Sequence, residues 1–265
     1  MKYIESRNNQ TIKNIAALRE RRERESQGLF YFEGVHLLEE YLRAGNMPYA
    51  VFVREDVRER YKELLSRLEC EAYLVSESVY NKLTDEKAPQ GIFTVSSRLN
   101  NVSFLSGEEL LGRINGNSIM MCDLQDNGNV GTIIRTAATL DCSVILCGGC
   151  ADVYSSKTVR ATMGALFTAD IFVCKDTEGA INALKEDGIR VIAAALRNNS
   201  LTLGEFETRS NDCFVIGNEG QGLSQSVTEA CSESCIIPMS GRTESLNAAS
   251  AAAILLWEAK RRRMK

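Results

Sequence analysis

The chain has 265 residues, of which 44% are hydrophobic and 25% charged, values that fit one large globular domain or two smaller ones. It contains no apolar run close to the ~20 residues of a membrane-spanning helix, and its first residues lack the apolar core of a signal peptide. We therefore expect a cytoplasmic protein without membrane contact. The net charge of −4 argues against a protein that coats nucleic acid indiscriminately.

Nine cysteines and a single histidine restrict the metal and redox chemistry. Most of the cysteines lie in apolar runs, which favours reduced, buried thiols. The Cys147-Gly-Gly-Cys150 spacing has only Cys231 and Cys235 as a near second pair, so we interpret it as a glycine-rich loop. His36 lies in a helical pattern with no nucleophile motif beside it. We expect no metal site.

The first hundred residues alternate between short apolar runs and amphipathic segments. The pattern predicts helices at 12–27, 35–45, 57–69 and 78–85 and strands at 29–34, 49–55, 72–76 and 92–97. This alternation predicts a small α/β domain over residues 1–100. The segment 101–116 is polar and rich in Gly and Asn, and we expect it to be a linker.

Residues 117–265 carry a second alternating series. Strands are predicted at 118–125, 143–148, 170–176, 189–196, 214–218 and 235–239, and helices at 126–141, 155–169, 177–188, 227–231 and the C-terminal end. Near-continuous apolar strands that alternate with helices indicate a parallel sheet covered on both faces. Ligands of such sheets bind at the carboxyl ends of the strands.

Three stretches that follow apolar runs carry candidate chemistry. The first, Asp123–Ala137, reads NxGxxxR and contains Asn129 and Arg135. Arg135 lies about one turn after Gly131, so its side chain can return over the loop. Asn129 and Arg135 are not on one helical stripe, and they converge only if Asn129 lies in the loop. Taken on its own, this stretch is better explained as an ordinary Asn-Gly turn followed by a surface arginine.

The second stretch, GNEGQGLS, lies at 217–224, and the third, IPMSGRTESLN, at 237–247. The glycines allow a ligand to approach the backbone closely. Their order is GxxGxG, not the GxGxxG of dinucleotide-binding folds, and Glu219 would repel a pyrophosphate. This makes a nucleotide-dependent oxidoreductase a remote alternative and favours a cationic or neutral ligand.

Together, and in this order, the three stretches resemble the motifs of the SpoU-type (TrmH-like) RNA ribose 2′-O-methyltransferases of the SPOUT superfamily. The first hundred residues are similar to that family's small RNA-binding domain of the ribosomal L7Ae/L30e type. The resemblance implies an N-terminal α/β domain and a C-terminal parallel-sheet domain with a deep trefoil knot. It also implies S-adenosyl-L-methionine as the cofactor, bound largely through backbone groups.

The resemblance assigns roles to particular residues. Cofactor binding falls on Leu196, Ile216, Gly217, Ile237, Met239 and Leu246. Arg135 would lie nearest the reacting hydroxyl, with Asn129 orienting it or the ribose and Glu219 fixing the loop or pairing with Arg135. Ser245 and Asn247 would complete the pocket. Because guanidinium stays protonated, we expect Arg135 to act electrostatically, without abstracting a proton.

The implied partners are RNA and a second copy of the chain. Small residues along the C-terminal helix allow another helix to pack closely, and the family forms homodimers through this region. Both ends of the chain are basic and could contact RNA phosphates. Ribosomal RNA is the expected substrate, because the N-terminal domain suits structured RNA. The alternatives are transfer RNA, and a non-catalytic RNA-binding factor associated with the ribosome.

Overall fold

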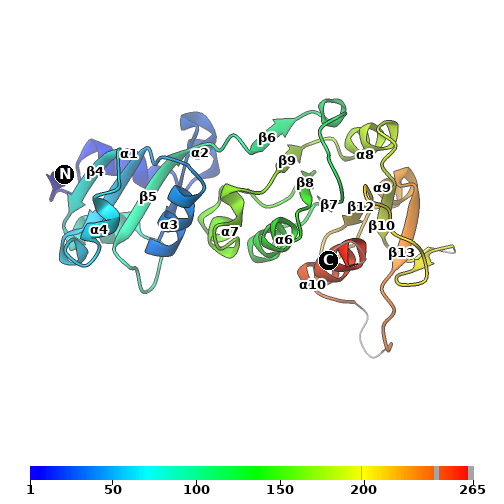
Figure 1. Ribbon diagram of the computed structural model, residues 1–265. Coiled ribbons are helices and arrows are strands. Elements are labelled where there is room, and N and C mark those ends of the chain that lie inside the picture. Colours follow the sequence, from blue (N-terminus) through cyan, green and yellow to red (C-terminus); the bar gives the residue numbers. More distant parts are fainter. Residues whose placement is uncertain (198, 242–244, 262–265) are drawn as a thin grey trace. The chain divides into compact units, whose positions relative to one another are not determined.

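The computed structural model describes residues 1–197, 199–241 and 245–261, which form two compact units (Figure 1). Unit 1 comprises Met1–Leu99 and Asp152–Phe167, and unit 2 comprises Asn100–Ala151 and the chain from Thr168 onward. Three residues of the third motif, 242–244, and the basic residues at 262–265 lie outside the described residues. Among the described helices, none is long and apolar enough to cross a membrane.

Unit 1 is built on a mixed five-stranded sheet in the order β1-β4-β3-β5-β2. Its strands are β1 Lys2–Ile4, β2 Leu29–Glu33, β3 Ala50–Arg54, β4 Glu71–Val75 and β5 Ile92–Ser97. The pairs β1/β4 and β3/β4 are parallel, whereas β5 is antiparallel to both β2 and β3. The first strand, β1, had no signal in the sequence pattern.

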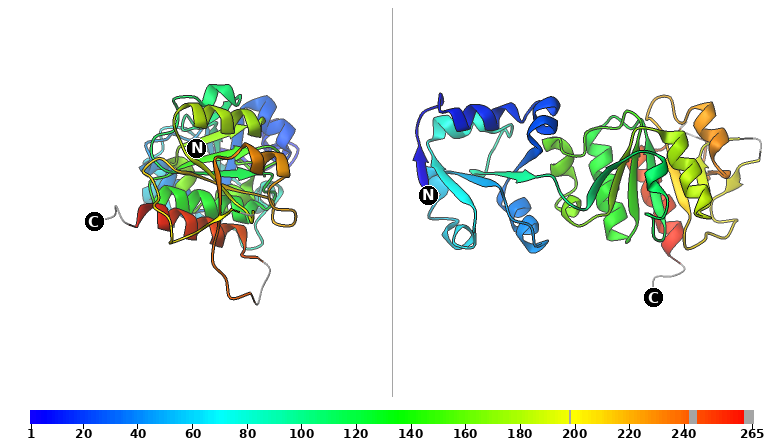
Figure 2. Two further views of the ribbon diagram at one scale, coloured as in Figure 1. Left: turned by 90° about the vertical axis from the view of Figure 1, so that its right-hand side faces the viewer. Right: turned by 90° about the horizontal axis from the view of Figure 1, so that it is seen from above.

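The helices of unit 1 lie on both faces of this sheet, as Figure 2 shows for α1 and α3. They are α1 Gln10–Ala17, α2 Arg21–Gln27, α3 Val35–Arg43, α4 Lys62–Leu65, α5 Glu77–Leu83 and the 3₁₀ turn η1 Glu55–Val57. The apolar faces of α1 and α5 bury Ile12 and Tyr80 against Phe52 and Phe93 of the sheet. Burial of these side chains supplies the main stabilisation of the unit.

The segment Asp152–Phe167 belongs to unit 1, although we expected it as a helix of the second series. It forms α7 Ser156–Ala161 and the 3₁₀ turn η3 Ala165–Phe167. The Tyr154 ring lies 4.6 Å from that of Phe30 on β2, and Phe167 lies 5.2 Å from Phe32. These contacts bury aromatic surface between segments that are far apart in the sequence. Periodicity along the chain cannot predict which segment an aromatic side chain packs against.

Unit 2 is built on an eight-stranded sheet in which every strand is parallel to its neighbours. The order is β11-β13-β10-β12-β7-β8-β9-β6. The strands are β6 Val102–Leu105, β7 Ser118–Cys122, β8 Ser143–Cys147, β9 Ile171–Cys174, β10 Val191–Ala194, β11 Leu201–Thr202, β12 Cys213–Ile216 and β13 Glu233–Ile236. The predicted parallel α/β sheet is confirmed.

Helices cover both faces of this sheet (Figure 1). They are α6 Asn127–Thr139, α8 Thr177–Glu186, α9 Gln225–Ala230, α10 Ala248–Lys260 and the 3₁₀ turn η2 Glu108–Leu110. Helices α8 and α9 pack on one face around Met120, Ile145 and Val215. Helices α6 and α10 pack against each other and against β7 on the other face. The residues of the central strands therefore meet a helix layer on either face, which explains their near-continuous apolar runs.

The segment 101–116, which we expected to be a linker, carries a strand of this sheet. Val102–Leu105 pairs with Ile171–Cys174 in parallel register, and Leu110 is buried in the core under α8. The polar, glycine-rich composition concealed it because an edge strand is only partly covered: Val102 is buried, whereas Phe104, two residues further on the same face, is exposed. The trefoil knot implied by the resemblance stays a prediction.

Candidate cofactor pocket and catalytic residues

The three motifs meet at one edge of the unit 2 sheet. Because all its strands run in one direction, β7 ends at Cys122, β10 at Ala194, β12 at Ile216 and β13 at Ile236 on the same edge. The segments that follow these strands carry the residues predicted for the site. The sheet topology therefore collects side chains that are far apart in the sequence.

Helix α6 begins inside the first motif. Asp126 is its N-cap and accepts a hydrogen bond of 2.7 Å from the backbone N–H of Asn129. Asn129 thus lies in the first helical turn and not in the loop, so the condition for it to converge with Arg135 is not met. In the sequence, Asp126 lies three residues before Asn129 and is a residue type that caps helices. This was the available signal that the helix begins before Asn129.

Asn129 is the centre of a hydrogen-bonded cluster. Its Nδ2 donates to Glu219 Oε1 at 3.1 Å, and its Oδ1 accepts from Asn247 Nδ2 at 3.0 Å. Asn247 is also the N-cap of α10, because its Oδ1 accepts from the backbone N–H groups of Ala249 and Ser250. One predicted residue from each motif is therefore fixed in a single chain of hydrogen bonds.

A tight turn carries Glu219. Asn218 and Gly222 exchange two backbone hydrogen bonds of 3.1 and 2.9 Å, and Asn218 Oδ1 accepts from the N–H groups of Gly220 and Gln221. A Cβ added to Gly217 would lie 2.3 Å from the carbonyl carbon of Gly222, so only glycine fits there. Asn218 did not stand out in the sequence, yet it holds the turn together.

Arg135 stands apart from this cluster. It lies six residues after Asn129 on the same helix, which separates the two by about 9 Å along the axis and about 240° around it. The side chain is exposed, and within the described residues it has no hydrogen bond or ion pair. Glu219 bonds Asn129, not Arg135. Within one chain, Asn129 therefore does not orient Arg135.

A pocket of about 280 Å³ lies beside the cluster at the ends of β10 and β13. Five of the predicted residues line it, namely Leu196, Ile237, Met239, Ser245 and Leu246. Leu196 is 83% exposed, and Met239 and Leu246 are also exposed. Ile216 and Gly217 are not part of this lining, although Ile216 ends the strand beside β10. Ser245 lies here and not in the hydrogen-bonded cluster.

The composition of the pocket suits an apolar ligand group. Its lining is mainly aliphatic and comes from the ends of β10 and β13 and from the segment at the start of α10, which is a usual composition of a small-molecule site. Exposed leucine and methionine side chains at a strand end contribute little to the stability of the fold, because they stay accessible to water. A flat apolar ring of a ligand can cover them.

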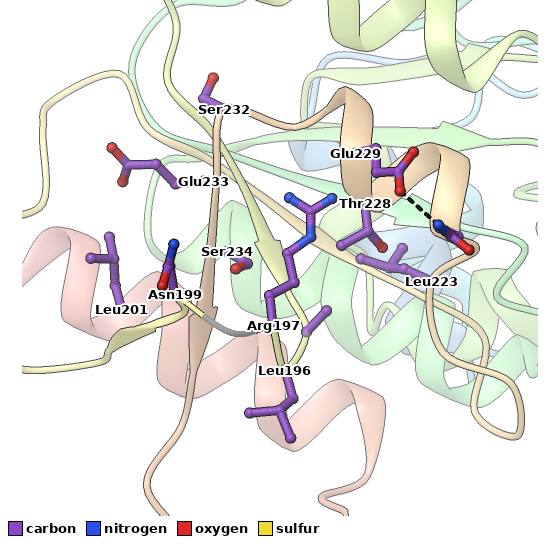
Figure 3. Close-up of a pocket in the computed structure, with 12 residues that line it drawn as sticks. Leu196, Arg197, Asn199, Leu201, Leu223, Thr228, Glu229, Ser232, Glu233 and Ser234 are labelled. Carbon is purple, nitrogen blue, oxygen red and sulfur yellow. Dashed lines mark hydrogen bonds between the residues drawn. The ribbon is translucent and has the colours of Figure 1, made fainter.

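A larger pocket of about 950 Å³ lies between α9 and the β11–β13 end of the sheet (Figure 3). Arg197 points toward Thr228 and Glu229 there, whereas Leu196 points away. Glu229 accepts a hydrogen bond from Gln225, and Glu233 pairs with Arg190. Leu196 is the one predicted site residue among the described residues that line it. Its lining is largely polar and contains no residue of the Asn129 cluster, so we do not assign it to the cofactor.

The Cys147-Gly-Gly-Cys150 loop lies at the same edge of the sheet. Burial raises the pKa of the Cys150 thiol to about 11, and Cys150 Sγ donates to the carbonyl of Met121 at 3.3 Å. A thiol in this state is protonated near neutral pH and is a poor nucleophile. Among the described residues, no group of His, Cys, Asp or Glu side chains could hold a metal ion.

Comparison with known proteins identifies the class to which this fold and site belong. Residues 116–257 match the model of the SpoU rRNA methylase family, and residues 9–94 match the model of the MRM3-like substrate binding domain. The first match covers more than half of the chain. The chain belongs to the SpoU rRNA methylase family.

Individual relatives extend over nearly the whole chain. The 23S rRNA (guanosine(2553)-2′-O)-methyltransferase RlmP of Bacillus subtilis is 33% identical over 260 residues, covering 97% of this chain and 98% of RlmP. The mitochondrial rRNA methyltransferase 3 of Mus musculus is 30% identical, covering 90% of this chain and 68% of its own. Among solved structures, the AdoMet-bound rRNA methyltransferase from Sinorhizobium meliloti is 27% identical with a TM-score of 0.85, covering 100% of this chain and 99% of its own.

These findings confirm the predicted family, the α/β architecture with a small N-terminal domain, and the enzyme class. The chain is an S-adenosyl-L-methionine-dependent rRNA methyltransferase, and the alternatives of an oxidoreductase and of a non-catalytic RNA-binding factor are set aside. The roles of individual residues stay predictions.

Proposed function

We propose that this protein methylates a ribose 2′-hydroxyl of large-subunit ribosomal RNA at the edge of the unit 2 sheet. The observation that supports this assignment is the hydrogen-bonded cluster of Asn129, Glu219 and Asn247 beside the 280 Å³ apolar pocket. RlmP, whose name states a 2′-O-methylation of 23S rRNA, aligns over nearly all of both chains. Unit 1, which contains the match to a substrate-binding domain, is the part that recognises the RNA.

The reaction requires little of the protein beyond positioning and electrostatics. S-adenosyl-L-methionine, when bound, supplies a methyl group activated by a sulfonium. Leu196, Ile237 and Leu246 hold the cofactor by apolar contact, with Ile216, Gly217 and Met239 beside them. Asn129, held between Glu219 and Asn247, keeps its amide in one orientation and positions the ribose.

Arg135 acts on the developing charge of the 2′-oxygen. A hydroxyl is a poor nucleophile: as the oxygen–methyl bond forms and the sulfur–methyl bond of the donor breaks, its proton passes to solvent. The guanidinium remains protonated, so it stabilises the negative charge that develops on the oxygen and does not act as the base. An exposed arginine with no partner among the described residues is available for this role.

The active form is a homodimer. Helix α10 exposes Ile254 and Trp257, which are 39% and 53% accessible, on the side away from the core residues Leu255 and Leu256. Within a single chain, Arg135 lies apart from the Asn129 cluster. A complete site therefore needs Arg135 from a second copy. Large exposed apolar side chains on a terminal helix are typical of such interfaces.

The direct test measures methyl transfer. Wild-type protein and Arg135→Ala are incubated with tritiated S-adenosyl-L-methionine and with rRNA from a strain that lacks the protein. We expect label in a 2′-O position of large-subunit rRNA with the wild type and at least ~100-fold less with the variant. Arg113→Ala removes an exposed arginine elsewhere in unit 2 and should keep full activity. Label in transfer RNA alone would contradict the rRNA assignment.

Mixing two inactive variants tests the shared site. If Arg135 of one copy serves Asn129 of the other, an Arg135→Ala/Asn129→Ala heterodimer retains one intact site. Equal amounts of the two variants, denatured and refolded together, should then recover about a quarter of wild-type activity. A mixture that stays as inactive as either variant would contradict a site built from two copies.

A further inference from the structure

Asp123 has an unusual backbone conformation at the start of the first motif. Its φ is +54°, and among the described residues other than glycine only Asp141 and Met163 also have positive φ. A side chain in this left-handed region costs conformational energy, which persists only where surrounding contacts hold it. Asp123 directly follows β7, at the edge of the sheet where the site lies.

The carboxylate of Asp123 is held by the glycine-rich loop that contains Cys147 and Cys150. Its Oδ1 accepts a hydrogen bond of 2.6 Å from the backbone N–H of Gly149. A Cβ on Gly148 would lie 2.5 Å from the same oxygen. The two glycines of this loop therefore leave space for the Asp123 carboxylate. This explains the glycines of the Cys-Gly-Gly-Cys motif without any thiol chemistry.

The backbone of Asp123 contacts the turn of the second motif. Its carbonyl oxygen accepts a hydrogen bond of 3.0 Å from Asn218 Nδ2. Asn218 Oδ1 in turn accepts from the N–H groups of Gly220 and Gln221. The carboxylate bond to Gly149 and a 3.2 Å bond from the Asp123 N–H to the Cys147 carbonyl hold this residue in place, and with it the carbonyl that anchors Asn218.

The anchored turn carries Glu219 between Asn218 and Gly220. Glu219 is exposed, and it reaches the proposed catalytic cluster through its bond from Asn129. A shift of the turn would move this carboxylate away from Asn129. A misplacement of about 1 Å at such a position can cost ~100-fold in rate.

We propose that Asp123 is a positioning residue that, through its carboxylate bond to Gly149 and its carbonyl bond to Asn218, fixes the 217–223 turn and thereby places Glu219 against Asn129. This inference rests on the proposed function of that cluster. Asp123 does not line the 280 Å³ pocket, so its role concerns the rate of methyl transfer and not the affinity for the cofactor.

The Asp123→Gly substitution distinguishes the contribution of the carboxylate from that of the left-handed backbone conformation. Glycine adopts positive φ freely, so the change introduces no strain, but it removes the bond to Gly149 and lets the carbonyl turn away. Asp123→Asn keeps an acceptor oxygen, and asparagine also tolerates the left-handed region. The matched control is Asp141→Gly, which makes the same change at φ +51° in unit 2, at the far end of α6.

Two readouts are measured on the full-length protein. Hydrogen exchange of the amides of Gly220 and Gln221, which are bonded to Asn218, reports the turn without any activity. We expect their exchange to be at least ~10-fold faster in Asp123→Gly and within ~3-fold of wild type in Asp123→Asn and Asp141→Gly. The maximal rate of methyl transfer to rRNA should fall about tenfold in Asp123→Gly, whereas the Kd for S-adenosyl-L-methionine changes by less than ~3-fold.

The outcomes separate this inference from the proposed function. Unchanged exchange of the turn in Asp123→Gly would overturn the positioning role, whatever the activity. So would a rate equal to wild type, or an equal loss in Asp141→Gly. Wild-type protein that transfers no methyl group to rRNA would contradict the proposed function, while the exchange measurement would still decide whether Asp123 holds the turn.

Discussion

Asn247, the N-cap of α10, donates a hydrogen bond of 3.0 Å to Asn129, which lies 118 positions earlier in the chain. The same Asn247 side chain caps α10 through its oxygen. One amide therefore both begins a helix and holds a residue of the proposed catalytic cluster. Its two functions can be separated by substitution, because they use different atoms.

Asn247→Asp should remove activity without loss of stability. Aspartate caps a helix as well as asparagine does, but it places a second oxygen against Asn129 Oδ1. Methyl transfer should fall at least ~10-fold, with a thermal midpoint within ~2 °C of wild type. The rate assay and a thermal melt check this prediction.

Asn247→Ala is the comparison. It loses the cap as well, which costs ~1 kcal/mol and lowers the midpoint by about 2–4 °C. If Asn247→Asp retained full activity, the bond to Asn129 would have no catalytic importance.

Gly217→Ala should disrupt the turn of the second motif. The added Cβ would lie 2.3–2.5 Å from backbone atoms of Gly222 and Leu223, which cannot move aside as a flexible side chain can. We expect a stability loss of about 1–3 kcal/mol, as for other overpacked sites, together with slower methyl transfer to rRNA. Gly220→Ala is the matched control, because its Cβ would meet only Asn218 Oδ1 at 3.6 Å. Similar effects of the two substitutions would contradict this account.

Leu196→Ala should weaken cofactor binding and leave folding unchanged. The side chain is 83% exposed, so its removal costs the folded chain little. Covering it with the cofactor would bury apolar surface worth about 1–2 kcal/mol, so the Kd should rise about 5- to 30-fold. Leu111→Ala, at a leucine that is 48% exposed and lies outside the pocket, should change neither quantity. An unchanged Kd in Leu196→Ala would place the cofactor elsewhere.

Stability should fall at alkaline pH. Burial raises the pKa of the Cys213 and Cys235 thiols to about 12, and that of the Tyr31 and Tyr154 phenols to about 12. Above the ordinary thiol pKa of about 8.5, the unfolded chain loses these protons before the folded chain does, so the free energy of unfolding decreases as pH rises toward 12.

The urea midpoint should therefore decrease between pH 8.5 and pH 10.5. Cys213→Ala, which removes one such thiol, should lower the midpoint at pH 8.5 but flatten its decline with pH. A midpoint independent of pH over this range would contradict the contribution of the buried thiols.

Local sequence patterns predicted most of the helices and strands, because the central part of such an element depends on residues that are close in the sequence. The runs at 143–148 and 214–218 became β8 and β12. The strands β1 and β6 were missed, since each has only three or four residues and lies at a sheet edge. The placement of 152–167 in unit 1 was also missed, because aromatic contacts between distant segments leave no periodic signal.

The sequence alone determined the class of this protein. The order of its three motifs and the wrong glycine order for a dinucleotide site depend on residue identity and spacing, which need no coordinates. Only the tertiary structure decided how the motifs act together. Asn129 was predicted to orient Arg135 or the ribose, and it could converge with Arg135 only from a loop, whereas it lies in α6 and bonds Glu219 and Asn247. Those bonds span 90 and 118 positions, and only the parallel sheet, which brings its strand ends to one edge, decides which distant side chains meet.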